Sequence, residues 1–273
     1  MFNYTDIELT RKGQVATIRI LPSGPDLSGR HPGAYPAIHS DIGEALIEIR
    51  GDNNIRVVVL TGTGDSFQVP PPRSPWAEAH NNPGVDWDLT LGLTRTLEAF
   101  IETEKLIIAK VNGNAISFGS SIAFASDFIV AREDVIFADH HLAMGEILNY
   151  RSDFGTAPGD GGAVFVPLYM SPALAKEYLL LAKPMTGAEL ARMGIINYAV
   201  PADKLDETVD SLVQRLLKRS PYALAWGKRV INRRLAQNMA LTHDAAWLAE
   251  LANFYMAQPA CKEKGGERGV TTL

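Results

Sequence analysis

The segment most informative about the fold runs from residue 106 to residue 126 and reads Leu106-Ile-Ile-Ala-Lys-Val-Asn112-Gly113-Asn-Ala-Ile-Ser-Phe118-Gly119-Ser-Ser-Ile-Ala-Phe-Ala-Ser126. Its first six residues form an apolar, partly β-branched run, which is typical of a strand buried on both faces. The pair Asn112-Gly113 is a turn signal. The small side chains that follow, from about Gly119 to Ser126, predict a closely packed helix. This segment therefore predicts a strand, a tight turn and a helix in immediate succession.

On either side of this segment, strands alternate with helices over the first two-thirds of the chain, and helices dominate the last third. The stretch 68–88 holds five prolines and is expected to be a long loop. The patterns predict strands at 14–20, 56–61, 106–111, 128–131 and 135–137, and helices at 36–49, 89–103, 119–126, 172–181, 186–193, 202–218, 222–238 and 241–256. We expect an α/β core over residues 1–200, a helical segment over 201–257 and a flexible tail over 258–273.

The composition excludes several classes of protein. The chain has 273 residues, 46% of them hydrophobic, with a formal net charge of -5, and this acidity argues against a nucleic-acid partner. A single cysteine, Cys261, excludes a disulfide framework and a thiolate metal cluster. No apolar run approaches the ~20 residues that span a bilayer, and the first residues have no signal-peptide pattern. We therefore expect a cytoplasmic protein with no membrane contact.

Three motifs in the right order resemble the crotonase (enoyl-CoA hydratase/isomerase) superfamily. The first is the 106–126 stretch, and the second is the turn Pro158-Gly-Asp160-Gly-Gly162. The third begins at Leu180-Leu-Ala-Lys-Pro-Met-Thr186-Gly-Ala-Glu189 and continues to Pro201. The resemblance implies a spiral core of repeated ββα units with a helical C-terminal segment used for assembly. It also implies a homotrimer or a hexamer built as a dimer of trimers.

The residues of a hydratase site are absent from the matching positions. Crotonase enzymes generally stabilise an enolate oxygen with two backbone N–H groups. The best match to the first donor is Pro71, which has no N–H, and the second maps near Phe118 and Gly119. The two hydratase glutamates map to Ser121 and His141, so neither position supplies a carboxylate.

The replacements resemble another branch of the superfamily, the β-diketone hydrolases related to oxocamphor hydrolase. His141, Asp160 and Glu250 match the catalytic positions of that branch, which cleaves a carbon–carbon bond without coenzyme A. The chain departs from it through an apparent insertion at Glu146–Phe154 and through the lack of a histidine near Gly119. His140 is a candidate for that second imidazole.

The resemblance implies a retro-Claisen hydrolysis, in which water attacks one carbonyl of a 1,3-diketone and an enolate leaves. His141 is the expected general base, because imidazole titrates near neutral pH. Asp160 is expected to orient it, and Glu250 to position water or pair with a histidine. Trp76, Trp87 and Phe118 are expected to line an apolar pocket for a small hydrophobic, cyclic diketone. No metal and no cofactor is expected, and the remaining histidines show no metal-site spacing, namely His31, His39, His80 and His243.

Two other functions stay open. An acyl-CoA hydratase, isomerase or thioesterase with a remodelled site would use a coenzyme A thioester, and Arg73 with the basic C-terminal helices could meet its phosphates. A scaffold without catalytic activity would explain the missing glutamates. The histidine at residue 141 and the aspartate at residue 160 have side chains that can transfer protons, which argues against the scaffold.

Overall fold

Two sheets carry the fold of the computed structural model, which describes residues 4–22, 37–70, 83–144 and 155–257. The larger sheet has the order β1-β2-β3-β5-β7-β10 and is parallel except for the β1–β2 pair. Its strands are β1 (Ile7–Lys12), β2 (Val15–Ile20), β3 (Val57–Thr61), β5 (Leu106–Val111), β7 (Phe128–Arg132) and β10 (Tyr198–Val200). The smaller sheet has the order β4-β6-β8-β9, with β4 (Ser66–Gln68), β6 (Asn114–Ile116), β8 (Ile136–Ala138) and β9 (Met185–Thr186).

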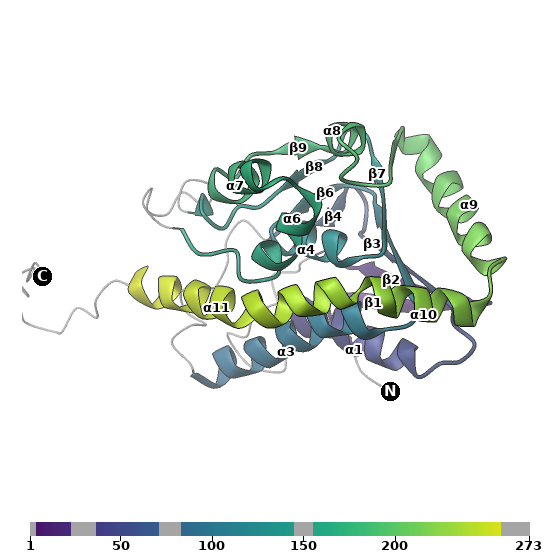
Figure 1. The fold of residues 1–273 in the computed structure, drawn as a ribbon, viewed down its shortest axis with the longest axis horizontal. Helices are drawn as coiled ribbons and strands as arrows, with labels where there is room; N and C mark the ends of the chain where they lie inside the picture. Colours follow the sequence, from purple (N-terminus) through teal and green to yellow (C-terminus); the bar gives the residue numbers. More distant parts are fainter. Residues whose placement is uncertain (1–3, 23–36, 71–82, 145–154, 258–273) are drawn as a thin grey trace, which may run out of the picture.

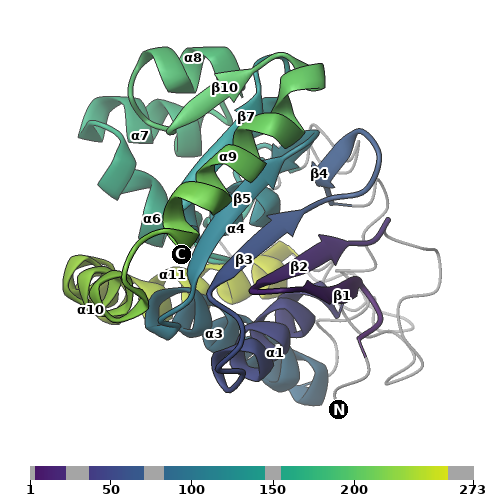
Figure 2. The same cartoon turned by 90° about the vertical axis from the view of Figure 1, so that its right-hand side faces the viewer.

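The helices pack on both faces of the larger sheet, as Figures 1 and 2 show. In chain order they are α1 (Ile38–Arg50), α3 (Pro83–Glu102), α4 (Phe118–Ala125), α6 (Gly162–Tyr169), α7 (Pro172–Leu180), α8 (Gly187–Arg192), the short 3-10 helix Ala202–Lys204, α9 (Leu205–Leu217), α10 (Pro221–Ile231) and α11 (Arg233–Ala257). None of the helices in these described ranges is long and apolar enough to cross a membrane.

Alternate residues of the central strands enter two separate cores. On β3, Val58 and Leu60 join the large core shared with α1, α3 and α4, whereas Val57 and Val59 face the other way. This second core is closed by the apolar side of α9, which lies across the sheet in Figure 2. Burial on both faces explains why these strands are continuous apolar runs in the sequence.

The predicted strand–turn–helix unit is present and has an additional strand. Asn112 holds the turn, because its Oδ1 accepts the N–H of Gly62 at 2.8 Å and its Nδ2 donates to the Gly64 carbonyl at 2.7 Å. A side chain at Gly113 would overlap the Asp65 carbonyl oxygen, which lies 2.0 Å from the Cβ position. The chain then forms β6 before α4 begins at Phe118.

The structure corrects three expectations about the elements. The loop expected over 68–88 ends earlier, since α3 begins at Pro83, and proline is favoured at the start of a helix. The hairpin strand β1 and the helix α6 were not expected from the sequence pattern. The last two helices meet at Asn232 rather than near residue 240. The expected flexible tail, 258–273, lies outside the described residues.

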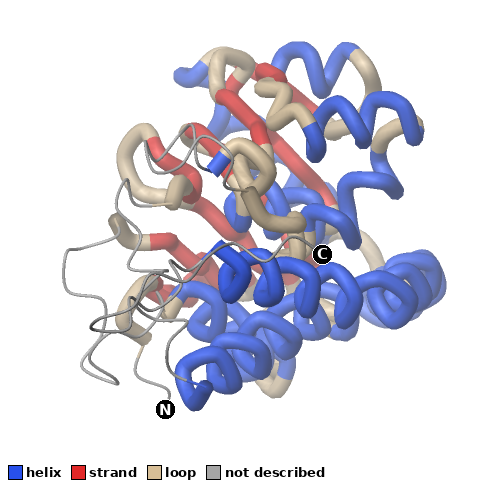
Figure 3. The backbone as a smooth tube through the Cα atoms, turned by 90° about the vertical axis from the view of Figure 1, so that its left-hand side faces the viewer, coloured by secondary structure: helices blue, strands red, loops and turns tan. Residues whose placement is uncertain are grey.

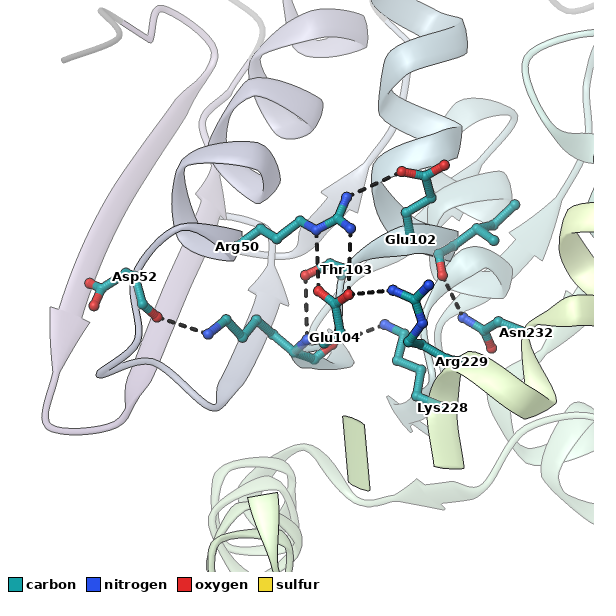
Figure 4. A network of polar contacts seen from close by, with 10 residues as sticks. Arg50, Asp52, Glu102, Thr103, Glu104, Lys228, Arg229 and Asn232 are labelled. Carbon is teal, nitrogen blue, oxygen red and sulfur yellow. Dashed lines mark hydrogen bonds and ion pairs between the residues drawn. The ribbon is translucent and has the colours of Figure 1, made fainter. Parts of the chain in front are cut away.

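A polar network holds the end of α10 and its junction with α11 against the core (Figure 4). Glu104 accepts hydrogen bonds from Arg50 Nε at 3.2 Å and from Arg229 Nη1 at 2.7 Å. Lys228 Nζ donates to the Lys105 carbonyl, and Asn232 Nδ2 donates to the Ile101 carbonyl at 3.1 Å. Because Asn232 joins α10 to α11, these contacts set the direction in which α11 leaves. Figure 3 shows α11 running beside α3, and it also packs against α6.

Candidate active site

His141 is placed by the chain that leaves strand β8. Its imidazole is buried, and Nδ1 lies 2.6 Å from Oδ1 of Asp139, the first residue after the strand. The same Asp139 oxygen accepts the backbone N–H of His141 at 3.1 Å. The backbone carbonyl of His141 accepts the N–H of Thr156 at 2.9 Å, which ties this segment to the next loop. Both the ring and the backbone of His141 are therefore fixed.

Asp160 reaches His141 from the glycine-rich turn before helix α6. Its Oδ2 lies 3.3 Å from Nε2 of His141, and its Oδ1 accepts a hydrogen bond from Ser121 Oγ at 2.9 Å. The next residue, Gly161, has a φ of 120°, a backbone conformation that other residues rarely adopt. The turn thus aims a buried carboxylate at the imidazole, and Ser121 holds that carboxylate by its hydrogen bond.

Glu250 approaches the same ring nitrogen from helix α11. Its Oε1 lies 3.6 Å from His141 Nε2, and its Oε2 accepts the backbone N–H of Gly159 at 2.9 Å. The sequence-predicted residues His141, Asp160 and Glu250, separated by up to 109 positions in the chain, therefore meet at one point. The orienting contact expected of Asp160 differs, because Asp139 takes Nδ1 while Asp160 and Glu250 both face Nε2.

Burial and mutual charge shift the pKa values of this cluster in different directions. Burial lowers the pKa of His141, but the charges of Asp139, Asp160 and Glu250 outweigh it and raise the value well above normal. Burial raises the pKa of Asp160, yet the His141 charge and hydrogen bond lower it overall. Burial raises the pKa of Glu250 to about 8, with the Asp160 charge adding to the effect. Two carboxylates facing one nitrogen are thus separated into an ionised and a protonated one near neutral pH.

The N-terminal turn of helix α4 lies beside this cluster. Phe118, the first residue of α4, is buried, and its ring centroid is 4.3 Å from that of His39. Gly119 packs so tightly that a Cβ there would lie 2.3 Å from the Gln68 carbonyl oxygen. The first N–H groups of a helix have no partner within the helix, so this turn can supply a donor to a substrate oxygen.

Two residues near the site were not selected from the sequence. Asp139 contacts His141 directly, and the Asp139-His-His141 run was its only signal in the sequence. His39 comes from α1, and its charge helps lower the pKa of Asp160, which places a second imidazole near the cluster. Sequence spacing could not have found His39, because more than a hundred residues separate it from Asp160.

The remaining expected site residues have different placements. His140 is partly buried, its backbone N–H donates to Ser117 Oγ at 3.2 Å, and burial lowers its ring pKa. Trp87 lies on α3 with its side chain 63% exposed, which does not support the apolar pocket wall expected of it. Trp76, Pro71, Arg73 and the segment 146–154 lie outside the described residues, as do Cys261, His31 and His80.

Asp139, His141 and Asp160 are the described residues whose ligand atoms come close enough together to suit a metal ion, within 4.8 Å of one another. Both nitrogens of His141 already face carboxylate oxygens, at 2.6 Å and 3.3 Å. These separations suit shared protons without an ion. The cluster can therefore accept and return a proton at Nε2.

Comparisons with known proteins agree with this architecture. The profile of the enoyl-CoA hydratase/isomerase family matches residues 35–268. A carnitinyl-CoA dehydratase of Salmonella typhi is 30% identical over 191 residues, which cover 69% of this chain and 68% of the relative.

Solved structures give the same result for the fold. An enoyl-CoA hydratase/isomerase of Mycobacterium paratuberculosis has a TM-score of 0.80 at 22% identity, covering 93% of this chain and 96% of the other. A β-diketone hydrolase of Anabaena sp. PCC 7120, bound to (S)-3-oxocyclohexyl acetic acid, has a TM-score of 0.78 at 22% identity and covers 94% and 96%.

Proposed function

The chain belongs to the enoyl-CoA hydratase/isomerase family of the crotonase superfamily, and we propose that within it the protein is a hydrolase that cleaves the carbon–carbon bond of a β-diketone. One observation carries the proposal: His141 Nε2 faces the carboxylates of Asp160 and Glu250 at 3.3 Å and 3.6 Å. An imidazole with two acidic neighbours is suited to moving protons during hydrolysis. The fold neighbour from Anabaena carries the name of such a hydrolase and supports the choice.

The proposed reaction begins with water. His141 Nε2, in the fraction of molecules where it is unprotonated, takes a proton as the water oxygen bonds to one carbonyl carbon of the diketone. The tetrahedral intermediate collapses, the bond between that carbon and the central carbon breaks, and its electron pair forms the enolate of the second ketone. Protonation of the central carbon completes the reaction, so that one water and one diketone give a carboxylic acid and a ketone.

The carboxylates take different roles in this scheme. Asp160, whose pKa is lowered, stays ionised and stabilises the imidazolium that forms on His141. Glu250, whose pKa burial raises to about 8, carries a proton at neutral pH and suits the acid that protonates the enolate carbon. The backbone N–H of Phe118, at the start of α4, is the proposed donor to the enolate oxygen.

The proposal extends to substrate and assembly. The substrate is a small hydrophobic, cyclic diketone, with Phe118 as an apolar contact, and neither a metal nor a cofactor takes part. The protein assembles as a homotrimer or as a dimer of trimers, and proteins of this fold are typically oligomeric.

An acyl-CoA reaction is the second candidate, and the relatives named carnitinyl-CoA dehydratase favour it. The hydratase carboxylates are nevertheless replaced by Ser121 and His141, and Ser121 is engaged with Asp160. An acyl-CoA function would therefore have to use Asp160 or Glu250 as its acid and base.

The test is to incubate the pure protein separately with a cyclic 1,3-diketone and with crotonyl-CoA. We expect a keto acid from the diketone, detected by mass spectrometry with one 18O atom when the reaction runs in H2(18)O. The variant that tests the base is His141→Gln, which we expect to lower the rate of diketone hydrolysis roughly 10²- to 10⁴-fold. Consumption of the CoA ester alone would identify an acyl-CoA enzyme, and no turnover of either would favour a scaffold. An unchanged diketone rate in His141→Gln would remove His141 as the base.

A further inference from the structure

Asp139 is a third buried carboxylate at the site, and neither the proposed reaction nor the sequence motifs give it a role. Its Oδ1 lies 2.6 Å from His141 Nδ1 and 3.1 Å from the His141 backbone nitrogen. We infer that Asp139 is the positioning residue of the site: it fixes the tautomer of His141, so that Nδ1 keeps its hydrogen and Nε2 is the nitrogen that exchanges protons. The inference deepens the proposed function and rests on it for its catalytic consequence.

The donors and acceptors available determine which atom donates in the contact between Asp139 and His141. An ionised carboxylate can only accept, so the hydrogen between Asp139 Oδ1 and Nδ1 belongs to the imidazole. The neutral ring has one N–H and one lone pair, and the lone pair must then be at Nε2. That nitrogen is the one that faces Asp160 and Glu250. The tautomer set by Asp139 thus directs the basic atom toward the two acids.

The other oxygen of Asp139 makes no hydrogen bond, among the described residues, that would draw the carboxylate away from His141. Its Oδ2 is buried without a hydrogen-bond partner there, and it packs against Gly162, whose Cβ position lies 2.5 Å away. A larger residue than glycine at the start of α6 would displace the carboxylate. The absence of a side chain at residue 162 therefore keeps Asp139 aligned with His141, while its hydrogen bonds all run through Oδ1.

The charges that face His141 come from three elements. Asp139 follows β8, Asp160 precedes α6, Glu250 lies on α11, and the neighbouring ring of His140 has a pKa lowered by burial. Among the interactions that raise the pKa of His141, the charge of Asp139 is the largest, and its hydrogen bond adds to it. Removing that charge should therefore change both the basicity and the tautomer of His141.

A purely structural role for Asp139 makes a different prediction. If Asp139 only shaped the chain after β8 through the 3.1 Å contact with the His141 backbone, asparagine would replace it, because its side-chain oxygen can accept the same N–H. The negative charge of residue 139 would be lost in either case, so the tautomer of the neutral imidazole is what separates the two roles.

The experiment is long-range 1H–15N NMR of protein labelled with 15N-histidine, with the His141 signals assigned from the spectrum of His141→Gln. In the wild type, titration to high pH should give a neutral His141 with its hydrogen on Nδ1. In Asp139→Asn, the His141 pKa should fall by about one unit or more, and the neutral ring should carry its hydrogen on Nε2. The matched control is Asp203→Asn, the same change at an exposed site, which should leave the His141 signals unchanged.

A wild-type His141 whose neutral form carries its hydrogen on Nε2 would overturn the inference without any variant, so failure of Asp139→Asn to fold does not leave it untested. An unchanged tautomer and titration in folded Asp139→Asn would also overturn it. The NMR measurement needs no substrate. If the tautomer changes but no diketone is cleaved, the positioning role stands and the proposed reaction fails. If diketone is cleaved with an unchanged tautomer, the proposed reaction stands and the positioning role fails.

Discussion

Glu250 Oε2 accepts the backbone N–H of Gly159 at 2.9 Å, and the absence of a side chain at residue 159 makes that contact possible. A Cβ there would lie 2.6 Å from Glu250 Oε2, 2.8 Å from the Ala246 carbonyl oxygen and 2.9 Å from the Trp247 Cα. The turn that carries Asp160 and the helix that carries Glu250 are therefore in direct backbone contact. The spacing of the two acids around His141 depends on this one glycine.

Gly159→Ala tests that dependence. We expect it to push α11 away from the turn, to lower the free energy of unfolding by about 1–3 kcal/mol and to reduce diketone hydrolysis about tenfold or more. The matched control is Gly227→Ala on α10, where a Cβ meets nothing within 4 Å and should stabilise the helix by about 0.5–1 kcal/mol. Urea unfolding and initial rates measure both variants. Equal behaviour of the two alanines would show that the close approach at residue 159 is unimportant.

The exposed side of α10 gives a prediction about assembly. Tyr222, Trp226 and Val230 recur at helical spacing and are 79%, 68% and 70% exposed, which is unusual for large apolar side chains. We expect Trp226→Glu to convert the proposed trimer or hexamer to smaller species in light scattering coupled to size-exclusion chromatography. The control is Lys218→Glu, at the exposed C-terminal end of α9, which should keep the wild-type mass. A monomeric wild type would contradict the proposed assembly.

The sequence predicted the core elements that are marked by a local residue pattern. The apolar run 106–111 became β5, and the three residues chosen by motif, His141, Asp160 and Glu250, meet in space. The family resemblance supplied those three positions, because no spacing rule connects a helix residue at 250 with a loop residue at 141.

What the sequence missed depends on tertiary contacts. The break at Asn232 is fixed by its hydrogen bond to the Ile101 carbonyl, and no local signal marks it. Helix α6 was not predicted because it begins at Gly162, the second of two consecutive glycines, and contains Pro167. From the sequence, Asp160 was the expected orienting residue of His141, whereas in the structure Asp139 lies 2.6 Å from Nδ1 and Asp160 lies 3.3 Å from Nε2.

Chelation tests the proposal that the reaction uses no metal. Asp139, His141 and Asp160 have ligand atoms within 4.8 Å of one another, so adventitious binding of Zn²⁺ is a reasonable concern. We expect the rate of diketone hydrolysis to be unchanged after dialysis against EDTA. Added Zn²⁺ should inhibit, because an ion bound to His141 Nε2 prevents that nitrogen from accepting the proton of water. Loss of activity on chelation, with recovery on adding one metal, would contradict the proposal.

The buried acid Glu250 predicts how stability changes with pH. Its folded-state pKa of about 8 lies above the usual value of 4.5, so the folded protein binds the proton more tightly than the unfolded chain does. This contribution is fully present below pH 4.5 and is lost as the pH rises through about 8. In Glu250→Gln, whose side-chain oxygen can still accept the Gly159 N–H, we expect a smaller loss of stability between those values. Urea midpoints measured from pH 5 to pH 9 check it, and parallel wild-type and variant curves would contradict it.

Asp160→Asn makes the sharpest prediction for catalysis, because it removes a charge next to the proposed base without changing its volume. In the wild type, the charges around His141 raise its pKa well above 6.5, and a base must be unprotonated, so kcat/KM should rise with pH through a midpoint above 6.5. It should fall again at higher pH as Glu250, whose pKa is about 8, loses the proton that it donates. Without the Asp160 charge, the imidazolium is less stable, the pKa of His141 falls, and the midpoint of the rise should move down by about one unit. The maximal rate should fall roughly 10²-fold or more, since the imidazolium formed in the reaction loses its counter-charge.

Ser121→Ala is the matched control: it removes one hydrogen bond to Asp160 but keeps the charge, so the midpoint should move much less. A midpoint that stays fixed in Asp160→Asn would mean that the titrating base is a group other than His141.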